Sequence, residues 1–186
     1  MGQVTLANKI SILRIILIPF FITATVYSRM DIALMIFLVA VISDGADGFI
    51  ARTFNQKTQL GTILDPVADK LLLISAYICL SVVGHIPEHL RMPPYVPILV
   101  ISRDAIIVIG SLIVYMIKGD IKISPSILGK ITTFFQMMTI VSILVKFNYS
   151  NIVWNVTVLL TIASGLDYVM KGSKFLSETS IFKKAG

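Results

Sequence analysis

Residues 44–69 read DGADGFIARTFNQKTQLGTILDPVAD, and the rest of the chain is organised around this stretch. Its 26 residues hold four of the ten acidic side chains, while the sequence on both sides is strongly apolar. A carboxylate in or beside a membrane is unfavourable unless it is paired, hydrated or bound to a metal. Four carboxylates at regular spacing therefore indicate a functional site.

The four aspartates form two pairs at helical spacing. Asp44 and Asp47 are three residues apart, and Asp65 and Asp69 are four apart, so each pair shares one face of a helix. If the polar turn 53–59 joins two antiparallel helices, both pairs face one pocket. Carboxylate oxygens suit Mg²⁺ or Mn²⁺, and such ions would remove the repulsion between neighbouring negative charges.

Small residues accompany these acids. Gly48, Ala51 and Gly61 leave room for a ligand to lie against the helix backbone. A plainer interpretation, with the acids solvated at helix ends, explains neither the small residues nor the spacing. A polar, metal-binding site half inside the membrane suits a lipid that carries a diphosphate. The residues themselves therefore predict metal-dependent chemistry on a phosphorylated lipid.

Hydropathy predicts an all-α integral membrane protein. The chain has 186 residues, 56% of them hydrophobic, and a mean hydropathy of +0.89, whereas soluble domains are usually a little under half apolar. We expect a single membrane domain, residues 1–186, with a short interfacial start and a mobile basic tail from about residue 171. Six transmembrane helices are predicted, at about 10–26, 31–51, 61–83, 95–117, 127–145 and 152–170.

The basic residues orient these helices. An even number of spans places both termini on one side of the membrane. If the motif turn lies on that side as well, that side carries eleven Lys and Arg residues, and the opposite side carries three. Basic loops stay cytoplasmic, so the termini and the intramembrane acidic site are predicted at the cytoplasmic face of an inner or plasma membrane. The net charge of +6 then reflects these loops and anionic lipid, and no basic patch with interleaved aromatics suggests nucleic acid.

The acidic stretch resembles the signature of the CDP-alcohol phosphatidyltransferase family. That signature is D-x-x-D-G-x-x-A-R, eight residues, then G-x-x-x-D-x-x-x-D, and every fixed position is filled here. The length and hydropathy of the whole chain are similar to the family as well. The resemblance implies an enzyme of phospholipid synthesis that moves a phosphatidyl group from CDP-diacylglycerol to an alcohol and releases CMP.

The resemblance also implies roles for individual residues. Asp44, Asp47 and Asp65 would bind two Mg²⁺ or Mn²⁺ ions. Asp69 would be the general base that deprotonates the acceptor hydroxyl, and it could share in metal binding. The nucleotide and its phosphates would be held by Gly48, Ala51, Arg52 and Gly61. Because the family often forms homodimers, a homodimer is expected, although the sequence shows no interface.

The motif leaves the acceptor alcohol open. Residues 6–14 and the Gly129-Lys130 region resemble members that use glycerol 3-phosphate or phosphatidylglycerol, the acceptor of cardiolipin synthases. We expect glycerol 3-phosphate, with phosphatidylglycerol as the alternative. Arg103 and Lys130 are candidates to bind the acceptor phosphate, although a structural ion pair would also explain Arg103. Asp104 is more typical of the cardiolipin synthases, since glycerol-phosphate enzymes more often have Glu there.

Other interpretations stay open for some features. Arg14 could contact substrate or snorkel to the membrane surface, and the stripe of Thr133 and Gln136 could line a cavity or bond to another helix. An intramembrane prenyltransferase also uses aspartates and Mg²⁺, but its two acidic motifs are typically far apart in sequence. An ion or proton transporter would place carboxylates in spans without needing the glycine, alanine and arginine of the motif.

Overall fold

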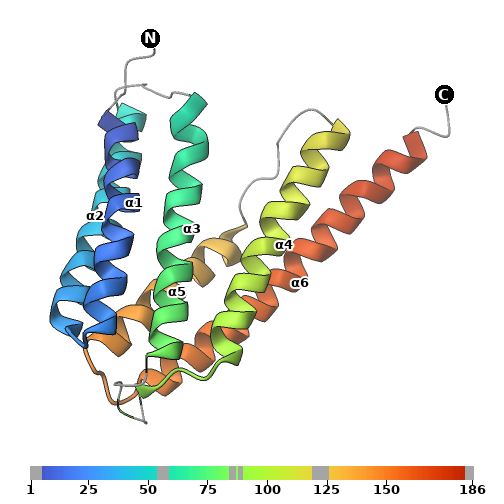
Figure 1. Cartoon of the computed structure of the whole chain (residues 1–186). Coiled ribbons are helices and arrows are strands. Elements are labelled where there is room, and N and C mark those ends of the chain that lie inside the picture. The colour runs from blue at the N-terminus through green and yellow to red at the C-terminus, as the bar shows by residue number, and fades with distance from the viewer. Residues whose placement is uncertain (1–5, 54–58, 84–86, 88–89, 119–125, 183–186) are drawn as a thin grey trace. The chain divides into compact units, whose positions relative to one another are not determined.

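Six α-helices make up nearly all of the part of the chain that the structure describes. This structure is a computed structural model, and it describes residues 6–53, 59–83, 87, 90–118 and 126–182. The helices in chain order are α1 (Leu6–Val26), α2 (Met30–Thr53), α3 (Gln59–Val82), α4 (Tyr95–Lys118), α5 (Ile127–Leu144) and α6 (Ser150–Phe182), as Figure 1 shows. No strand occurs among these residues, which confirms the predicted all-α class.

The last helix is longer than predicted. Hydropathy places the end of its span near Met170 and a mobile tail after it, whereas α6 continues for 33 residues to Phe182. At this point Lys171 and Asp167 form an ion pair with an Nζ–Oδ2 distance of 2.7 Å. Hydropathy marks where the apolar stretch ends, but a helix can continue into polar sequence that such i, i+4 pairs support. The predicted tail is therefore helical as far as Phe182.

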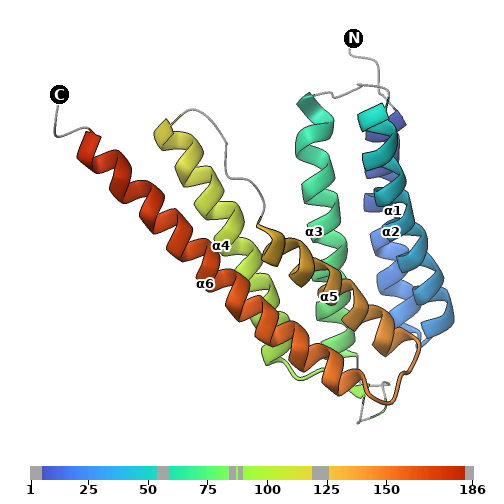
Figure 2. The same ribbon diagram turned by 180° about the vertical axis from the view of Figure 1, so that it is seen from behind.

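The helices group into two compact units. The first unit comprises Met1–Met92 with Ile140–Ser150, and the second unit comprises Pro93–Thr139 with Asn151–Gly186. In the first unit, α1 packs against both α2 and α3. Along the chain these three helices alternate in direction, so α2 runs antiparallel to both α1 and α3 (Figures 1 and 2).

Aromatic rings and small alanines fill the core of the first unit. The rings of Phe21 in α1 and Phe37 in α2 have centroids 6.0 Å apart, and both side chains are fully buried. Ala33 and Ala40, one turn to either side of Phe37, are also fully buried, so the helices can approach closely. We call Ala33, Phe37 and Ala40 the inward stripe of α2. The corresponding inward stripe of α3 is made of the buried residues Leu73, Ala76 and Leu80.

Hydroxyl groups join α5 and α6 in the second unit. The hydroxyl oxygens of Thr139 and Thr157 lie 2.7 Å apart, and Thr132 donates to the backbone oxygen of Leu160 at 3.2 Å. Positions that rise along α5 meet positions that fall along α6, so the two helices are antiparallel. Such side-chain bonds are the usual way in which polar residues hold helices together in a bilayer.

In contrast, α4 and α6 run in the same direction, side by side in both views (Figures 1 and 2). Near their first turns, Tyr95 donates to the Asn155 side-chain oxygen at 3.2 Å. Three turns later, Tyr168 donates to the backbone oxygen of Ile107 at 3.0 Å. These two contacts fix the register of the helices on either side of the residues between them.

The buried face of α6 carries hydroxyl groups, and its exposed face is apolar. Its buried positions include Thr157, Thr161 and Ser164. Its exposed large side chains are Ile152, Leu159, Ile162, Leu166, Val169 and Met170. A helix of a soluble protein shows the opposite arrangement. By length and apolar composition, Ile127–Leu144 and Ser150–Gly172 could each cross a bilayer. The second unit therefore has the surface that is typical of a membrane protein.

Candidate active site

The two acidic pairs of the motif lie on α2 and α3 near the ends that the motif turn connects. Asp47 lies six positions before the end of α2, and Asp65 lies six positions after the start of α3. At 1.5 Å per residue, both are about 9 Å from the helix end. Asp44 and Asp69 are nine and ten positions from the same ends. Because α2 and α3 run antiparallel, the predicted pairs lie at matching depths.

Each pair also continues the inward stripe of its own helix. In α2, Asp44 follows Ala40 by four positions and Asp47 follows three later. In α3, Asp69 precedes Leu73 by four positions, and Asp65 precedes Asp69 by four more. These are the spacings at which residues share one helix face. The backbone therefore sets both acidic pairs in register with the residues that pack in the core of the first unit.

The side chain of Asp69 lies within the described part of the chain, whereas those of Asp44, Asp47 and Asp65 lie outside it. Asp69 is half-buried and follows the fully buried Ala68. It is engaged in polar interactions within the protein. Among the described side chains, no three His, Cys, Asp or Glu residues gather as metal ligands would. The convergence of all four acids on one pocket therefore stays a prediction.

The acidic residues fit a divalent cation by their chemistry. All four are carboxylates, the oxygen ligands that Mg²⁺ and Mn²⁺ prefer, and they occupy stripes on two antiparallel helices. The predicted nucleotide-binding residues flank them: Gly48, Ala51 and Arg52 in the last turns of α2 and Gly61 in the first turn of α3. The structure places their backbones in these helices, and their side chains lie outside the described part.

A buried cation also lies in the first unit. Arg14 in α1 has 1% of its surface exposed, so its side chain does not snorkel to water as one interpretation of the sequence held. A guanidinium taken out of water is stable only where negative or polar groups surround it. Arg14 is engaged in such interactions within the protein. The alternative of substrate contact is left open for this residue.

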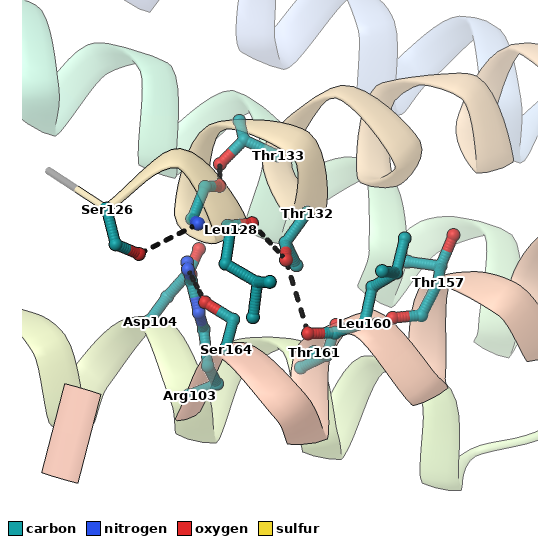
Figure 3. Close-up of polar contacts among 11 residues, drawn as sticks. Arg103, Asp104, Ser126, Leu128, Thr132, Thr133, Thr157, Leu160, Thr161 and Ser164 are labelled. Carbon is teal, nitrogen blue, oxygen red and sulfur yellow. Dashed lines mark hydrogen bonds and ion pairs between the residues drawn. The ribbon is translucent and has the colours of Figure 1, made fainter. Parts of the chain in front are cut away.

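In the second unit, Arg103 is a buried cation held at two points. It is 7% exposed and Asp104 is 4% exposed. Its Nη1 donates to Asp104 Oδ1 at 2.8 Å, and its Nη2 donates to Ser164 Oγ on α6 at 2.5 Å. Figure 3 shows the guanidinium reaching from α4 to the first turn of α5. Buried Nε has no hydrogen-bond partner among the described residues, which leaves a donor for a ligand.

The first turn of α5 is shaped to receive this guanidinium. Ser126 precedes the helix and accepts a hydrogen bond from the Gly129 backbone N–H at 3.1 Å, as an N-cap does. A methyl group on Gly129 would lie 3.2 Å from Arg103 Nη2, closer than ordinary contact. Lys130, the next residue, is exposed, and within the described part no hydrogen bond or ion pair joins it to Arg103. Of the predicted pair, Gly129 therefore lies directly against Arg103. Lys130 lies in the same turn of α5 without such a contact.

The cross-helix bonds of α5 come from other residues than the sequence suggests. In the predicted stripe of Thr133 and Gln136, Thr133 donates to the Gly129 backbone oxygen at 3.1 Å within its own helix, while Gln136 is fully buried. Thr132 and Thr139 make the cross-helix bonds instead. The sequence does not single out Ser164, because one serine in an apolar helix carries no motif. The recurrence of Thr157, Thr161 and Ser164 at helical spacing is the signal that could have revealed it.

Known proteins resemble the chain over nearly its whole length. A sequence model described as CDP-alcohol phosphatidyltransferase matches residues 4–163, which include helices of both units. The chain is 32% identical over 177 residues to the CDP-diacylglycerol–glycerol-3-phosphate 3-phosphatidyltransferase of Aquifex aeolicus, covering 91% of this chain and 96% of the relative. The protein of the same name from Haemophilus influenzae is 35% identical over 176 residues, covering 88% and 92%.

A relative with another name is similar too. The human cardiolipin synthase (CMP-forming) is 30% identical over 196 residues, which cover 91% of this chain and 62% of that protein. With its acidic signature complete and the family match extending over both units, the chain belongs to the CDP-alcohol phosphatidyltransferase family and is an enzyme that transfers a substituted phosphate group.

Proposed function

We propose that the protein transfers a phosphatidyl group from CDP-diacylglycerol to glycerol 3-phosphate, giving phosphatidylglycerophosphate and CMP. The reaction would take place in an inner or plasma membrane that the six helices span, with the acidic site and both termini on the cytoplasmic side. The diacylglycerol chains would stay in the bilayer, while the diphosphate reaches the ends of α2 and α3. Soluble glycerol 3-phosphate and the departing CMP would exchange with the cytoplasm.

One observation carries the proposal: the acidic pairs continue the inward stripes of α2 and α3 at matching depths. Carboxylates that faced one another from these two stripes would repel in a medium of low dielectric constant. A bound cation removes that repulsion and explains why all four are tolerated beside an apolar core. The same depth, about 9–15 Å from the helix ends, suits a lipid headgroup better than a solute that crosses the whole bilayer.

In this mechanism Asp69 acts as the general base. Its carboxylate takes the proton of the acceptor hydroxyl, and the hydroxyl oxygen forms a bond to the phosphorus that carries diacylglycerol. The bond from that phosphorus to the bridging oxygen breaks, and CMP leaves with the electron pair. Asp69 is suited to this role because it is half-buried, at the edge of the packed core beside Ala68. The proton on Asp69 then returns to water.

Asp44, Asp47 and Asp65 would hold the divalent ions, and Asp69 could share in binding them. Bound Mg²⁺ or Mn²⁺ would draw charge from the diphosphate and stabilise the negative charge that develops on CMP. Gly48, Ala51 and Gly61 would give the nucleotide access to the helix backbones, and Arg52 would add a positive charge close to its phosphates. This assignment extends the carboxylate chemistry of the two helices to the substrate.

Arg103 would bind the phosphate of the acceptor. A guanidinium has five N–H donors, and within the described residues Arg103 directs one from Nη1 and one from Nη2 to protein oxygens while buried Nε has no partner. Exposed Lys130 in the neighbouring turn would add a mobile positive charge. The relatives named for glycerol 3-phosphate in Aquifex aeolicus and Haemophilus influenzae favour that acceptor. The human cardiolipin synthase and Asp104 keep phosphatidylglycerol as the second candidate.

Product analysis with purified protein tests the proposal. CDP-diacylglycerol is supplied in detergent micelles with Mg²⁺ or Mn²⁺, and radiolabelled glycerol 3-phosphate or phosphatidylglycerol is added in separate reactions. We expect phosphatidylglycerophosphate and an equal amount of CMP with glycerol 3-phosphate. Chelation by EDTA should abolish both products, and excess Mg²⁺ or Mn²⁺ should restore them, because the carboxylates need a cation to be compatible with the diphosphate.

The other outcomes are also informative. Cardiolipin formed from phosphatidylglycerol, without product from glycerol 3-phosphate, would establish the second candidate. Full turnover in EDTA would contradict the metal-dependent part of the proposal. If no acceptor released CMP, the transfer reaction itself would be rejected for this chain, and ion binding by the four aspartates would become the better explanation of the motif.

A further inference from the structure

Arg103 binds a phosphate more tightly when its guanidinium is already held in one orientation. An arginine side chain is long and loses considerable rotamer freedom when it is fixed. Its stem lies along α6, because a methyl group on Gly165 would be 3.6 Å from Arg103 Cγ, an ordinary contact distance. The two hydrogen bonds of its head then decide which N–H groups remain for a ligand.

The two residues that accept hydrogen bonds from the Arg103 guanidinium act in different ways. Asp104 accepts from Nη1 and also brings a negative charge, so it offsets the charge of the guanidinium. Ser164 accepts from Nη2 and is neutral, so its hydroxyl affects orientation without changing the net charge. Ser164 is 1% exposed, and therefore no water can take over its bond without entering the packed interface.

Three helices meet at this point. A methyl group on Gly129 of α5 would lie 3.2 Å from Arg103 Nη2 and 3.9 Å from Ser164 Oγ. The guanidinium of α4 and the hydroxyl of α6 therefore share the space that the missing side chain of Gly129 leaves open. Figure 3 shows the side chains of Arg103 and Ser164 meeting here. The contacts of Tyr95 and Tyr168 hold α4 and α6 in register on either side of this space.

We propose that Ser164 is a positioning residue for acceptor recognition: its hydroxyl orients Arg103 so that the remaining guanidinium donors face the acceptor phosphate. This inference rests on the proposed role of Arg103. Ser164 itself would not touch the substrate. Removing its hydroxyl should therefore weaken acceptor binding and leave the chemistry and the donor lipid unaffected.

Steady-state kinetics of the full-length enzyme test the inference, with glycerol 3-phosphate and CDP-diacylglycerol varied separately. Ser164→Ala should raise the KM for glycerol 3-phosphate about tenfold, as loss of a hydrogen bond to a charged group does. The kcat and the KM for CDP-diacylglycerol should stay within about twofold of the wild type, because neither depends on the orientation of Arg103.

Thr161→Ala provides the matched control. Thr161 lies one turn before Ser164 on the same helix, is equally buried at 1% exposure, and donates to the Thr157 backbone oxygen at 2.7 Å within α6. This variant loses a hydroxyl of the same kind without touching Arg103. Its acceptor KM should equal that of the wild type. An equal rise in both variants would mean that general loosening of α6 is the cause, and the positioning role would be rejected.

A second variant guards against misfolding of the first. Gly129→Ala keeps Ser164 but places a methyl group against Nη2, and alanine favours the helix. It should raise the acceptor KM in the same selective way. Size-exclusion chromatography and thermal unfolding would check that each variant is folded. If folded Ser164→Ala kept the wild-type KM, the inference would be overturned. If Ser164→Ala did not fold, a wild-type KM in folded Gly129→Ala would overturn it instead.

Arg103→Gln separates failure of this inference from failure of the proposed function. If Arg103→Gln leaves the acceptor KM unchanged, Arg103 does not bind the acceptor and both statements fall. If Arg103→Gln raises the KM but Ser164→Ala does not, the positioning role alone is wrong. When both raise it, Ser164→Ala should add nothing in the Arg103→Gln background. A further rise in the double variant would mean that Ser164 acts on the acceptor directly, which also contradicts the proposal.

Discussion

At the scale of single residues, Asp69 combines the features that a general base needs. Its side chain is half-buried rather than sealed, and Ala68 beside it is packed in the core, so its backbone is fixed while part of the side chain stays accessible. A base in such a position exchanges a proton with the acceptor and then with water. The same carboxylate could instead be chiefly a metal ligand, and the two roles predict different losses.

Asp69→Asn distinguishes these roles. The amide cannot accept the hydroxyl proton, so kcat should fall by about 10²–10⁴-fold, the usual contribution of a general base. Binding of CDP-diacylglycerol, measured by equilibrium binding in the presence of Mg²⁺, should be largely retained. Asp167→Asn on α6 is the control, since that carboxylate pairs with Lys171 at 2.7 Å far along the chain and should not affect turnover. A loss of binding as large as the loss of turnover would make Asp69 mainly a ligand.

The candidate functional residues differ in how well the sequence reveals them. The aspartates are predictable because carboxylates in an apolar chain are rare and their spacing is fixed by helix geometry. Arg103 is predictable as a candidate for the same reason, but its partner is not. Ser164 is small and neutral, and it meets Arg103 only because α4 and α6 lie parallel in one register. That register depends on packing between distant segments, which hydropathy does not encode.

At the scale of helices, hydropathy predicts starts and ends well where polar turns interrupt the chain. The span expected at 95–117 is α4 from Tyr95 to Lys118, and the one at 127–145 is α5 from Ile127 to Leu144. The prediction fails at the end of α6, where the apolar stretch stops but the helix does not. Apolar composition indicates how many residues a bilayer would surround. The length of the helix depends instead on backbone hydrogen bonds and side-chain pairs.

The contact between α4 and α6 yields a stability prediction. A methyl group on Gly110 would lie 2.8 Å from Cε1 and 3.0 Å from the hydroxyl of Tyr168. That ring is held by its bond to the Ile107 backbone oxygen, so Gly110→Ala must displace it. We expect a loss of about 1–3 kcal/mol, as overpacking usually costs, seen as a lower midpoint of thermal unfolding in detergent.

Gly172→Ala is the matched control for this change. Gly172 also lies in a helix, and a methyl group there would meet nothing within 4 Å. The substitution should leave stability unchanged or raise it by about 0.5–1 kcal/mol, the helix preference of alanine over glycine. Equal midpoints for Gly110→Ala and Gly172→Ala would show that the approach of Tyr168 to α4 is looser than the structure has it.

At the scale of the whole molecule, the polar interior and apolar exterior of α6 indicate what surrounds the protein. Residues such as Leu159, Leu166 and Met170 are more than half exposed while the hydroxyls face inward, an arrangement that is typical of a helix with lipid outside. The sense of insertion is a separate question. The eleven basic residues that share the predicted side of the motif turn, against three on the other, favour a cytoplasmic motif.

Labelling of single cysteines tests this orientation. The chain has one cysteine, Cys79, so Cys79→Ala gives a background in which Asn148→Cys and Lys57→Cys can be compared. Asn148 is exposed in the turn between α5 and α6, which six spans place outside, whereas Lys57 belongs to the motif turn. In sealed right-side-out vesicles, a membrane-impermeant maleimide should label Asn148→Cys at once and Lys57→Cys only after detergent is added. Labelling of Lys57→Cys in intact vesicles would put the acidic site on the outer face, where cytoplasmic glycerol 3-phosphate could not reach it.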